Sequence, residues 1–166
     1  MAKLGFRNFD EMVGRSDKLD MQRAISHWKA QGLDFSRIFY KPDVDNATAV
    51  YHCENQDHGL EQALDHVLIA EAKPALEHGQ AVVINTPIRN VNRTFGAMLS
   101  GEVAKRYGHK GLPDDTIAIK VTGTAGQSFG AFLAQGISME LEGEGNDYVG
   151  KGMSGGRIAI YPPKDC

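Results

Sequence analysis

The hydrophobic pattern divides the chain into a helical linker segment, 1–79, and a β-type part, 80–166. Late in the first part, apolar residues recur at three- and four-residue spacing, which is typical of one face of a helix. These residues are Leu60, Ala63, Leu64, Val67 and Leu68. Proline is tolerated in the first turn of a helix and not in its interior. Pro74 therefore predicts one helix near 59–71 and a second near 73–78, closed by Gly79.

An earlier helix is predicted in "KLDMQRAISHWKAQG" (18–32), where Ser16 or Asp17 can cap the start and Gly32 the end. Trp28, the only tryptophan, lies in this segment. We expect it to anchor the packing of this segment against a neighbour. Stacking on a ligand is the less favoured alternative.

After residue 80 the pattern changes to short β-type runs with glycine-rich connections. The four runs are "AVVINTPIRN" (81–90), "TIAIKVTG" (116–123), "GISMELEG" (136–143) and "GRIAIYPP" (156–163). The segment 116–135 aligns with 136–155 at a constant offset of 20 residues, and a third copy begins one residue out of step. An earlier copy, 92–104, echoes 126–138 at 34 residues, and the extra residues fit an insertion, "AKRYGHKGLPDD", predicted as a helical turn and loop.

A fixed period near 20 residues is typical of a β-solenoid, in which each repeat forms one coil stacked on the last. We therefore expect a mainly β fold, a parallel β-helix of about 20 residues per coil after the helical linker. Glycines are expected at the sharp corners, because glycine adopts positive φ at little steric cost. The corners are Gly96, Gly123, Gly130, Gly143, Gly150 and Gly155. Two interior columns are expected, one of Phe95, Phe129 and Val149 and one of Leu99, Leu133 and Met153.

The stretch "GNDYVGKGMSGG" (145–156) resembles two nucleotide-binding patterns, a phosphate loop and G-x-G-x-x-G. Lys151 is followed by Gly152 and not by the Ser or Thr that would hold Mg²⁺. A β pattern follows, whereas both motifs need a helix whose N-terminus stabilises phosphate. Structural corners are therefore the favoured interpretation.

A second candidate site is "YHCENQDHGLEQALDH" (51–66), where Cys53 lies near His52, His58 and His66. Cysteine and histidine can bind zinc or act as nucleophile and base. The spacing suits neither well, because adjacent residues point apart in a strand, and Asp65 and His66 are expected on the exposed face of the helix. A turn entering a helix is favoured, and a metal-binding or thiol protein stays the alternative.

The segment "PIRNVNRTFG" (87–96) gathers Arg89, Asn90, Asn92 and Arg93, which could clamp an anion. Asparagine also suits left-handed corners, so a structural role is favoured.

The formal net charge of −3 gives no electrostatic case for a nucleic-acid or anionic-membrane partner. Two distant cysteines, Cys53 and Cys166, suggest free thiols and a reducing, cytoplasmic location. The N-terminus has no apolar core of a signal peptide, and no window approaches the roughly 20 apolar residues that span a membrane.

Five blocks resemble the C-terminal region of the glutamate synthase large subunit, in the order of that family. They are "MAKLGFRNFDEMVGR", "HWKAQGLDFSRIFY", "YHCENQDHGLEQALD", "PIRNVNRTFGAMLSGEVAKRYGHKGLPDDTI" and "GTAGQSFGAFLAQGISMELEGEGNDYVGKGMSGGRI". The glycine-rich part resembles the start of the GXGXG domain, which the family implies to be a right-handed parallel β-helix.

The resemblance implies an enzyme that makes glutamate from glutamine and 2-oxoglutarate, using an N-terminal cysteine, FMN and an iron–sulfur cluster. This chain starts Met1–Ala2 and has two cysteines. We therefore expect no catalytic, cofactor-binding or metal residue in it. The implied role is a scaffold whose partners are the amidotransferase and synthase domains. The family's β-helix continues for several more coils, so an open edge and self-association through it are also predicted.

Overall fold

The computed structural model describes residues 1–20, 26–45 and 47–166, which divide into two compact units, Met1–His58 and Gly59–Cys166. Each unit is described by itself. The second unit includes the helices that the hydrophobic pattern places before residue 80.

The unit Met1–His58 contains only short 3-10 turns among its described residues. They are η1 (Ala2–Leu4), η2 (Ser16–Lys18) and η3 (Trp28–Ala30). The helix predicted over 18–32 can be compared only in part, because residues 21–25 lie outside the described residues. Gly32, its predicted stop, has a positive φ of 87°.

The unit Gly59–Cys166 carries a parallel sheet and three α-helices. In chain order its elements are η4 (Leu60–Gln62), α2 (Asp65–Glu71), α3 (Lys73–His78), β1 (Val82–Ile88), α4 (Ala97–Tyr107), η5 (Gly108–Lys110), β2 (Ile117–Thr124), β3 (Ile137–Glu144) and β4 (Arg157–Tyr161). All four predicted β runs form strands. The helix predicted at 59–71 forms η4 and the later-starting α2, whereas α3 matches its prediction, with Pro74 in its first turn and Gly79 at its C-cap with φ 66°.

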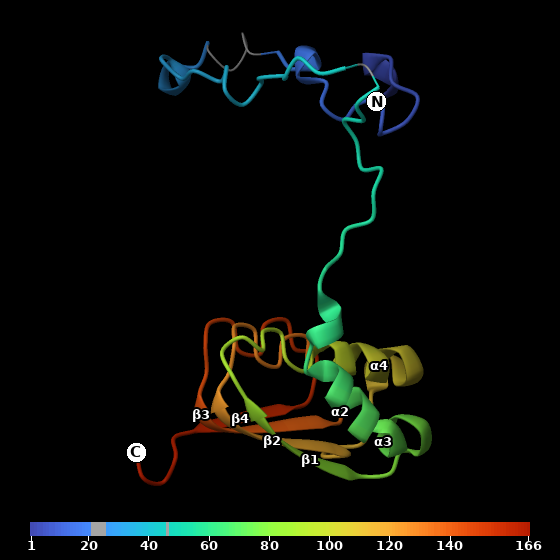
Figure 1. The fold of residues 1–166 in the computed structure, drawn as a ribbon, viewed down its shortest axis with the longest axis vertical. Coiled ribbons are helices and arrows are strands. Elements are labelled where there is room, and N and C mark those ends of the chain that lie inside the picture. Colours follow the sequence, from blue (N-terminus) through green and yellow to red (C-terminus); the bar gives the residue numbers. More distant parts are fainter. Residues whose placement is uncertain (21–25, 46) are drawn as a thin grey trace. The chain divides into compact units, whose positions relative to one another are not determined.

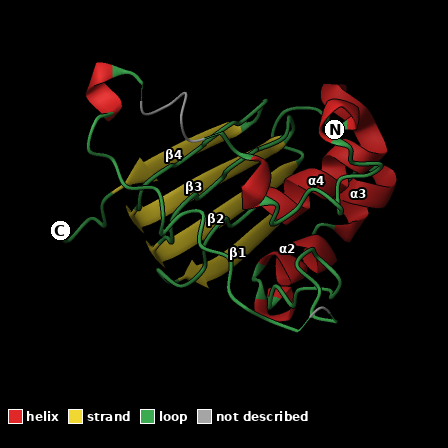
Figure 2. Cartoon of the chain, turned by 90° about the horizontal axis from the view of Figure 1, so that it is seen from above, coloured by secondary structure: helices red, strands yellow, loops and turns green. Residues whose placement is uncertain are grey.

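The four strands are all parallel and lie in the order β1-β2-β3-β4, as Figure 2 shows. The 20-residue offset is confirmed, because Ile117 pairs with Ile137 and Gly123 with Gly143. The last copy is one residue out of step, as predicted, since Ser138 pairs with Arg157. Strand β1 runs through Pro87, which its position at the edge of the sheet permits because an edge strand has one side without ladder bonds.

The prediction of a mainly β, right-handed β-helix is wrong. The unit is an α/β arrangement, with one four-stranded parallel sheet and helices against it. A coil of a β-helix needs a further strand after the first, but the residues at equivalent positions there, Thr94, Ser128 and Tyr148, have φ of 56°, 67° and 63°. Because strands need negative φ, these segments form turns. The 20-residue period therefore predicts the strands and their register correctly, and the structure of the segments between the strands incorrectly.

The core lies on one face of the sheet. Ile84, Ile119 and Met139 are paired neighbours on β1, β2 and β3, and all three are buried. Leu68 of α2 and Val103 of α4 complete the same buried cluster. Figure 1 shows α2, α4 and the turns that return from each strand on the same side of the sheet.

The opposite face of the sheet is open in this unit. It carries Val83, which is 65% exposed, and an ion pair between Lys120 and Glu140 with 4.0 Å between Nζ and Oε2. Glu142 and Tyr161 line a shallow groove on it. Parallel sheets are ordinarily covered on both faces, so this surface is suited to contact with another domain.

We expect Gly143→Ala to lower the free energy of unfolding by about 2 kcal/mol or more, measured by urea unfolding. Gly143 has φ 147°, and a methyl group there would collide with the carbonyl oxygen of Gly123 on β2. Gly101→Ala in α4 is the matched control, because a methyl group there meets nothing within 4 Å. It should stabilise by about 0.5–1 kcal/mol through helix propensity. Equal effects of the two changes would contradict the interpretation that position 143 needs glycine because its backbone lies against Gly123.

Candidate functional site

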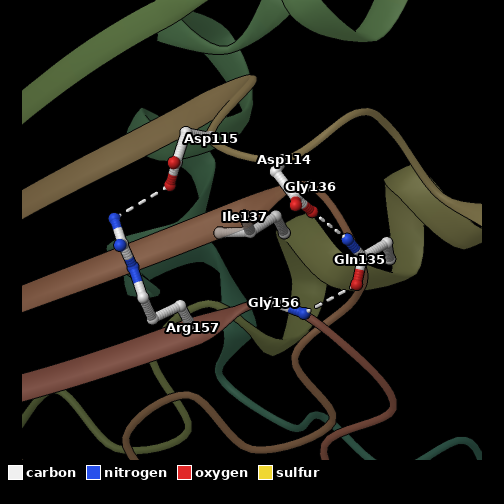
Figure 3. A pocket seen from close by; sticks show the side chains of 7 residues that line it. All are labelled: Asp114, Asp115, Gln135, Gly136, Ile137, Gly156 and Arg157. Atoms are coloured by element: carbon white, nitrogen blue, oxygen red, sulfur yellow. Dashed lines mark hydrogen bonds and ion pairs between the residues drawn. The ribbon is translucent and has the colours of Figure 1, made fainter.

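A polar cavity of about 170 Å³ lies where β2, β3 and β4 begin (Figure 3). Its lining comes from the three chain segments that enter these strands. The lining residues are Asp114, Asp115, Gln135, Gly136, Ile137, Gly156 and Arg157.

The polar groups of this cavity bind one another, as Figure 3 shows. Arg157 Nη2 donates to Asp115 Oδ1 at 3.0 Å, and Gly156 N–H donates to Gln135 Oε1 at 3.2 Å. The side-chain amide of Gln135 donates to the carboxylate of Asp114. The two bonds of Gln135, each spanning 21 residues, join the entries of successive strands, and the bond between Arg157 and Asp115, spanning 42 residues, joins the entries of β2 and β4.

The position of the cavity favours this structural role. In open α/β sheets, ligands bind beyond the carboxyl ends of the strands, whereas this cavity lies at the amino ends. The ion pair between Arg157 and Asp115 is exposed and contributes at most about 1 kcal/mol. Asp115, Gln135 and Arg157 are not among the candidate site residues predicted from the sequence, although extending the 20-residue alignment by one residue places Asp115 and Gln135 at equivalent positions.

The other polar feature is the buried carboxylate of Asp65 at the start of α2. It accepts hydrogen bonds from the N–H groups of Gly96 and Met98, both at 2.8 Å, and of Leu99 at 3.2 Å. Gly96 is the N-cap of α4, so Asp65 caps that helix from a distant part of the chain. The prediction that Asp65 lies on the exposed face of its helix is wrong, because Asp65 is buried. The helical spacing alone could not reveal its partners on α4.

Burial raises the pKa of Asp65 above its ordinary value of 3.8, and the hydrogen bonds from Gly96, Leu99 and Met98 act in the opposite direction. The α4 N-terminus also favours negative charge through its dipole. Asp65 therefore ties α2 to the start of α4.

The predicted interior columns are buried in their first two layers. Phe95 and Phe129 stack with ring centroids 5.7 Å apart and planes 3° from parallel. Leu99 and Leu133 are fully buried. In the third layer, Val149 and Met153 are 37% and 41% exposed, so this layer contributes to the surface.

The predicted corner glycines lie in the turns and at the strand ends. Five have positive φ: Gly96, Gly123, Gly130, Gly143 and Gly150. Gly155 packs against Gln135, where a methyl group would have no room. Turn backbones also stack, since Gly130 N–H donates to Phe95 O and Gly150 N–H donates to Phe129 O, both at 2.9 Å.

The nucleotide-like stretch leads into strand β4, so no helix N-terminus follows Lys151. The ammonium of Lys151 lies 4.7 Å from the ring centroid of Tyr148. The asparagines of the possible anion clamp make hydrogen bonds within and between turns. Asn92 Oδ1 accepts from Arg89 N–H at 2.9 Å, and Asn90 Oδ1 accepts from Asn146 Nδ2 at 2.7 Å. Both arrangements favour the structural interpretation.

The cysteine and histidine cluster does not converge within the described part of the chain. Cys53 is an exposed free thiol, and His66 Nε2 lies 2.9 Å from Leu60 O. No three His, Cys, Asp or Glu side chains of residues 1–20, 26–45 and 47–166 come together in a way that could hold a metal ion. The structure therefore gives no support to the metal-binding alternative.

The fold is thus a parallel sheet with stacked glycine turns, and the sequence profile of the GXGXG motif family matches residues 65–166. Because this match covers more than half of the chain, the protein belongs to the GXGXG motif family. The resemblance noted from the sequence blocks is confirmed.

The chain is similar to glutamate synthases over nearly its whole length. It is 51% identical over 165 residues to glutamate synthase [NADH] of Schizosaccharomyces pombe, covering 99% of this chain and 8% of that protein. It is 46% identical over 162 residues to the glutamate synthase [NADPH] large chain of Bacillus subtilis, covering 96% and 10%. It is 37% identical over 165 residues to ferredoxin-dependent glutamate synthase 2 of Synechocystis, covering 98% and 10%.

The chain therefore spans about a tenth of the length of these relatives. Among the helices of the described residues, none has the length and apolar character needed to cross a membrane.

We expect Asp65→Ala to lower the free energy of unfolding by about 2–3 kcal/mol, because three N–H groups at the start of α4 lose their acceptor. The loss in the free energy of unfolding is measured by urea unfolding, followed by circular dichroism. Glu102→Ala removes a partly buried carboxylate of α4 that pairs with the side chains of Lys105 and Arg106, and it is the control, with a smaller expected change. Comparable losses would show that Asp65 is not the cap.

We also expect the free energy of unfolding of the unchanged protein, relative to Asp65→Asn, to fall as the pH rises above 3.8. The pKa of Asp65 is raised in the folded state, so its contribution is present below 3.8 and lost as the pH rises through the folded-state pKa. A hydrogen bond from Arg15 lowers the pKa of Asp17 to about 2, and one from Arg106 lowers the pKa of Glu102 to about 2. Both groups are present in the two proteins, so their contributions cancel when the free energies of unfolding are subtracted. A difference that rises with pH would contradict this sign.

Proposed function

We propose that this chain is a non-catalytic scaffold segment of a glutamate synthase large subunit, located in the cytoplasm. The whole enzyme would make glutamate from glutamine and 2-oxoglutarate. The chain would hold the amidotransferase and synthase domains, its partners, in relation to each other. FMN and the iron–sulfur cluster would be bound by other parts of the enzyme.

The observation that carries this proposal is the similarity of nearly the whole chain to relatives named for three electron donors. Their names specify NADH, NADPH and ferredoxin. A segment shared across these proteins performs a task that does not depend on the donor. Holding domains in place is such a task, whereas binding one donor is not.

The geometry supports a scaffold in two ways. The stacked turns and the buried columns around Phe95 and Phe129 give a closely packed body. The open sheet face, with Lys120, Glu140 and Glu142, offers a polar surface of the kind found between domains of one chain. The polar cavity at Asp115 and Arg157 has its groups paired with one another, which suits a structural clip.

A chimeric subunit tests the proposal. The matching segment of the S. pombe glutamate synthase [NADH] is replaced by this chain, and glutamate formation from glutamine and 2-oxoglutarate is assayed. We expect the chimera to retain activity and the isolated chain to form no glutamate. Glutamate formation by the isolated chain would contradict a scaffold role. A folded chimera without activity would contradict the assignment to glutamate synthase.

A further inference from the structure

The unit Met1–His58 exposes most of its large apolar side chains. Ile38 is 74% exposed, Tyr40 73% and Trp28 70%. The other exposed large apolar residues of this unit are Met1, Leu4, Phe9, Leu19, Leu33, Val44, Val50 and Tyr51. Among the described residues of this unit, Phe6 is the only buried apolar side chain.

The composition of this unit is that of a folded segment. It contains seven aromatic residues: Phe6, Phe9, Trp28, Phe35, Phe39, Tyr40 and Tyr51. Segments that stay disordered are poor in aromatic residues, because they bury little apolar surface. A unit of this size needs a core to be stable, and its described residues supply almost none. Its apolar surface is therefore suited to burial against another body.

A groove of about 610 Å³ in this unit has the shape for such a contact. Two chain segments supply most of its lining, one with Met12 and Leu19 and the other with Ile38 and Tyr40. The hydroxyl of Ser16 donates to the carbonyl oxygen of Phe39 at 3.0 Å and joins the two segments. The lining is mostly apolar, as expected for a surface that receives apolar side chains.

The length of the relatives identifies the occupant. The similarity to the S. pombe protein covers 99% of this chain, including this unit, but only 8% of that protein. In the relatives, the unit is thus tethered to more than ten times its own length of chain, at a high effective concentration. The family match begins at residue 65, so the unit lies outside the GXGXG part.

We infer that Met1–His58 docks through Ile38, Tyr40 and the groove beside them onto an apolar surface of another domain of the same glutamate synthase large subunit. This inference rests on the proposed function. A second copy of the chain and a small apolar ligand are the other possible occupants, and the test separates them.

Hydrogen exchange of the Ile38 and Phe39 amides reports on docking, because both donate to Phe35 O, at 2.9 and 3.0 Å. We expect these amides to exchange at least tenfold more slowly in the chimeric subunit than in the isolated chain. Ile38→Asp should remove this protection in the chimera. Val91→Asp is the matched control, since Val91 is 81% exposed in the other unit, and it should leave the protection unchanged.

Equal exchange in the chimera and the isolated chain would overturn the inference. So would concentration-dependent protection of the isolated chain that Ile38→Asp abolishes, because the occupant would then be a second copy. Protection of the isolated monomer equal to that of the second unit would also overturn it, and this measurement needs no chimera. A protected but inactive chimera would support docking and contradict the proposed function.

Discussion

The second unit depends on the parallel ladder between β2 and β3. Ile117 pairs with Ile137 and Gly123 with Gly143, so each chain segment lies directly over its equivalent. The glycine pair allows the backbones to approach where side chains would collide. The pairing of β1 with β2 brings Phe129 onto Phe95 in the same way, and the polar clip at Gln135 forms between adjacent strand entries.

Two of the helices are joined to each other by one buried carboxylate. Asp65 is 31 to 34 residues from the amides it binds, so the contact closes a long loop and aligns α2 with the start of α4. The hydroxyl of Tyr107 adds a second link by donating to Leu76 O at 2.9 Å. The helices are thus fixed by polar contacts as well as by the apolar cluster.

The two units differ in how far they bury their apolar side chains, and this difference bears on function. The second unit buries its own, around Leu68, Met139 and Val103. The first unit exposes Trp28 and Ile38. A segment of a large subunit can have such a surface because the rest of the same chain is available to cover it. The open sheet face offers a second contact, of polar character.

Local pattern determined the four strands, the α3 boundaries at Pro74 and Gly79, and the register, because strand residues and glycines recur at a fixed offset. It also carried the family resemblance. Tertiary structure alone decided that the segments between strands are turns, since positive φ at Ser128 and Tyr148 depends on stacking with neighbouring turns. It likewise decided the burial of Asp65, because a helical period shows which residues share a face and not which distant amides that face will meet.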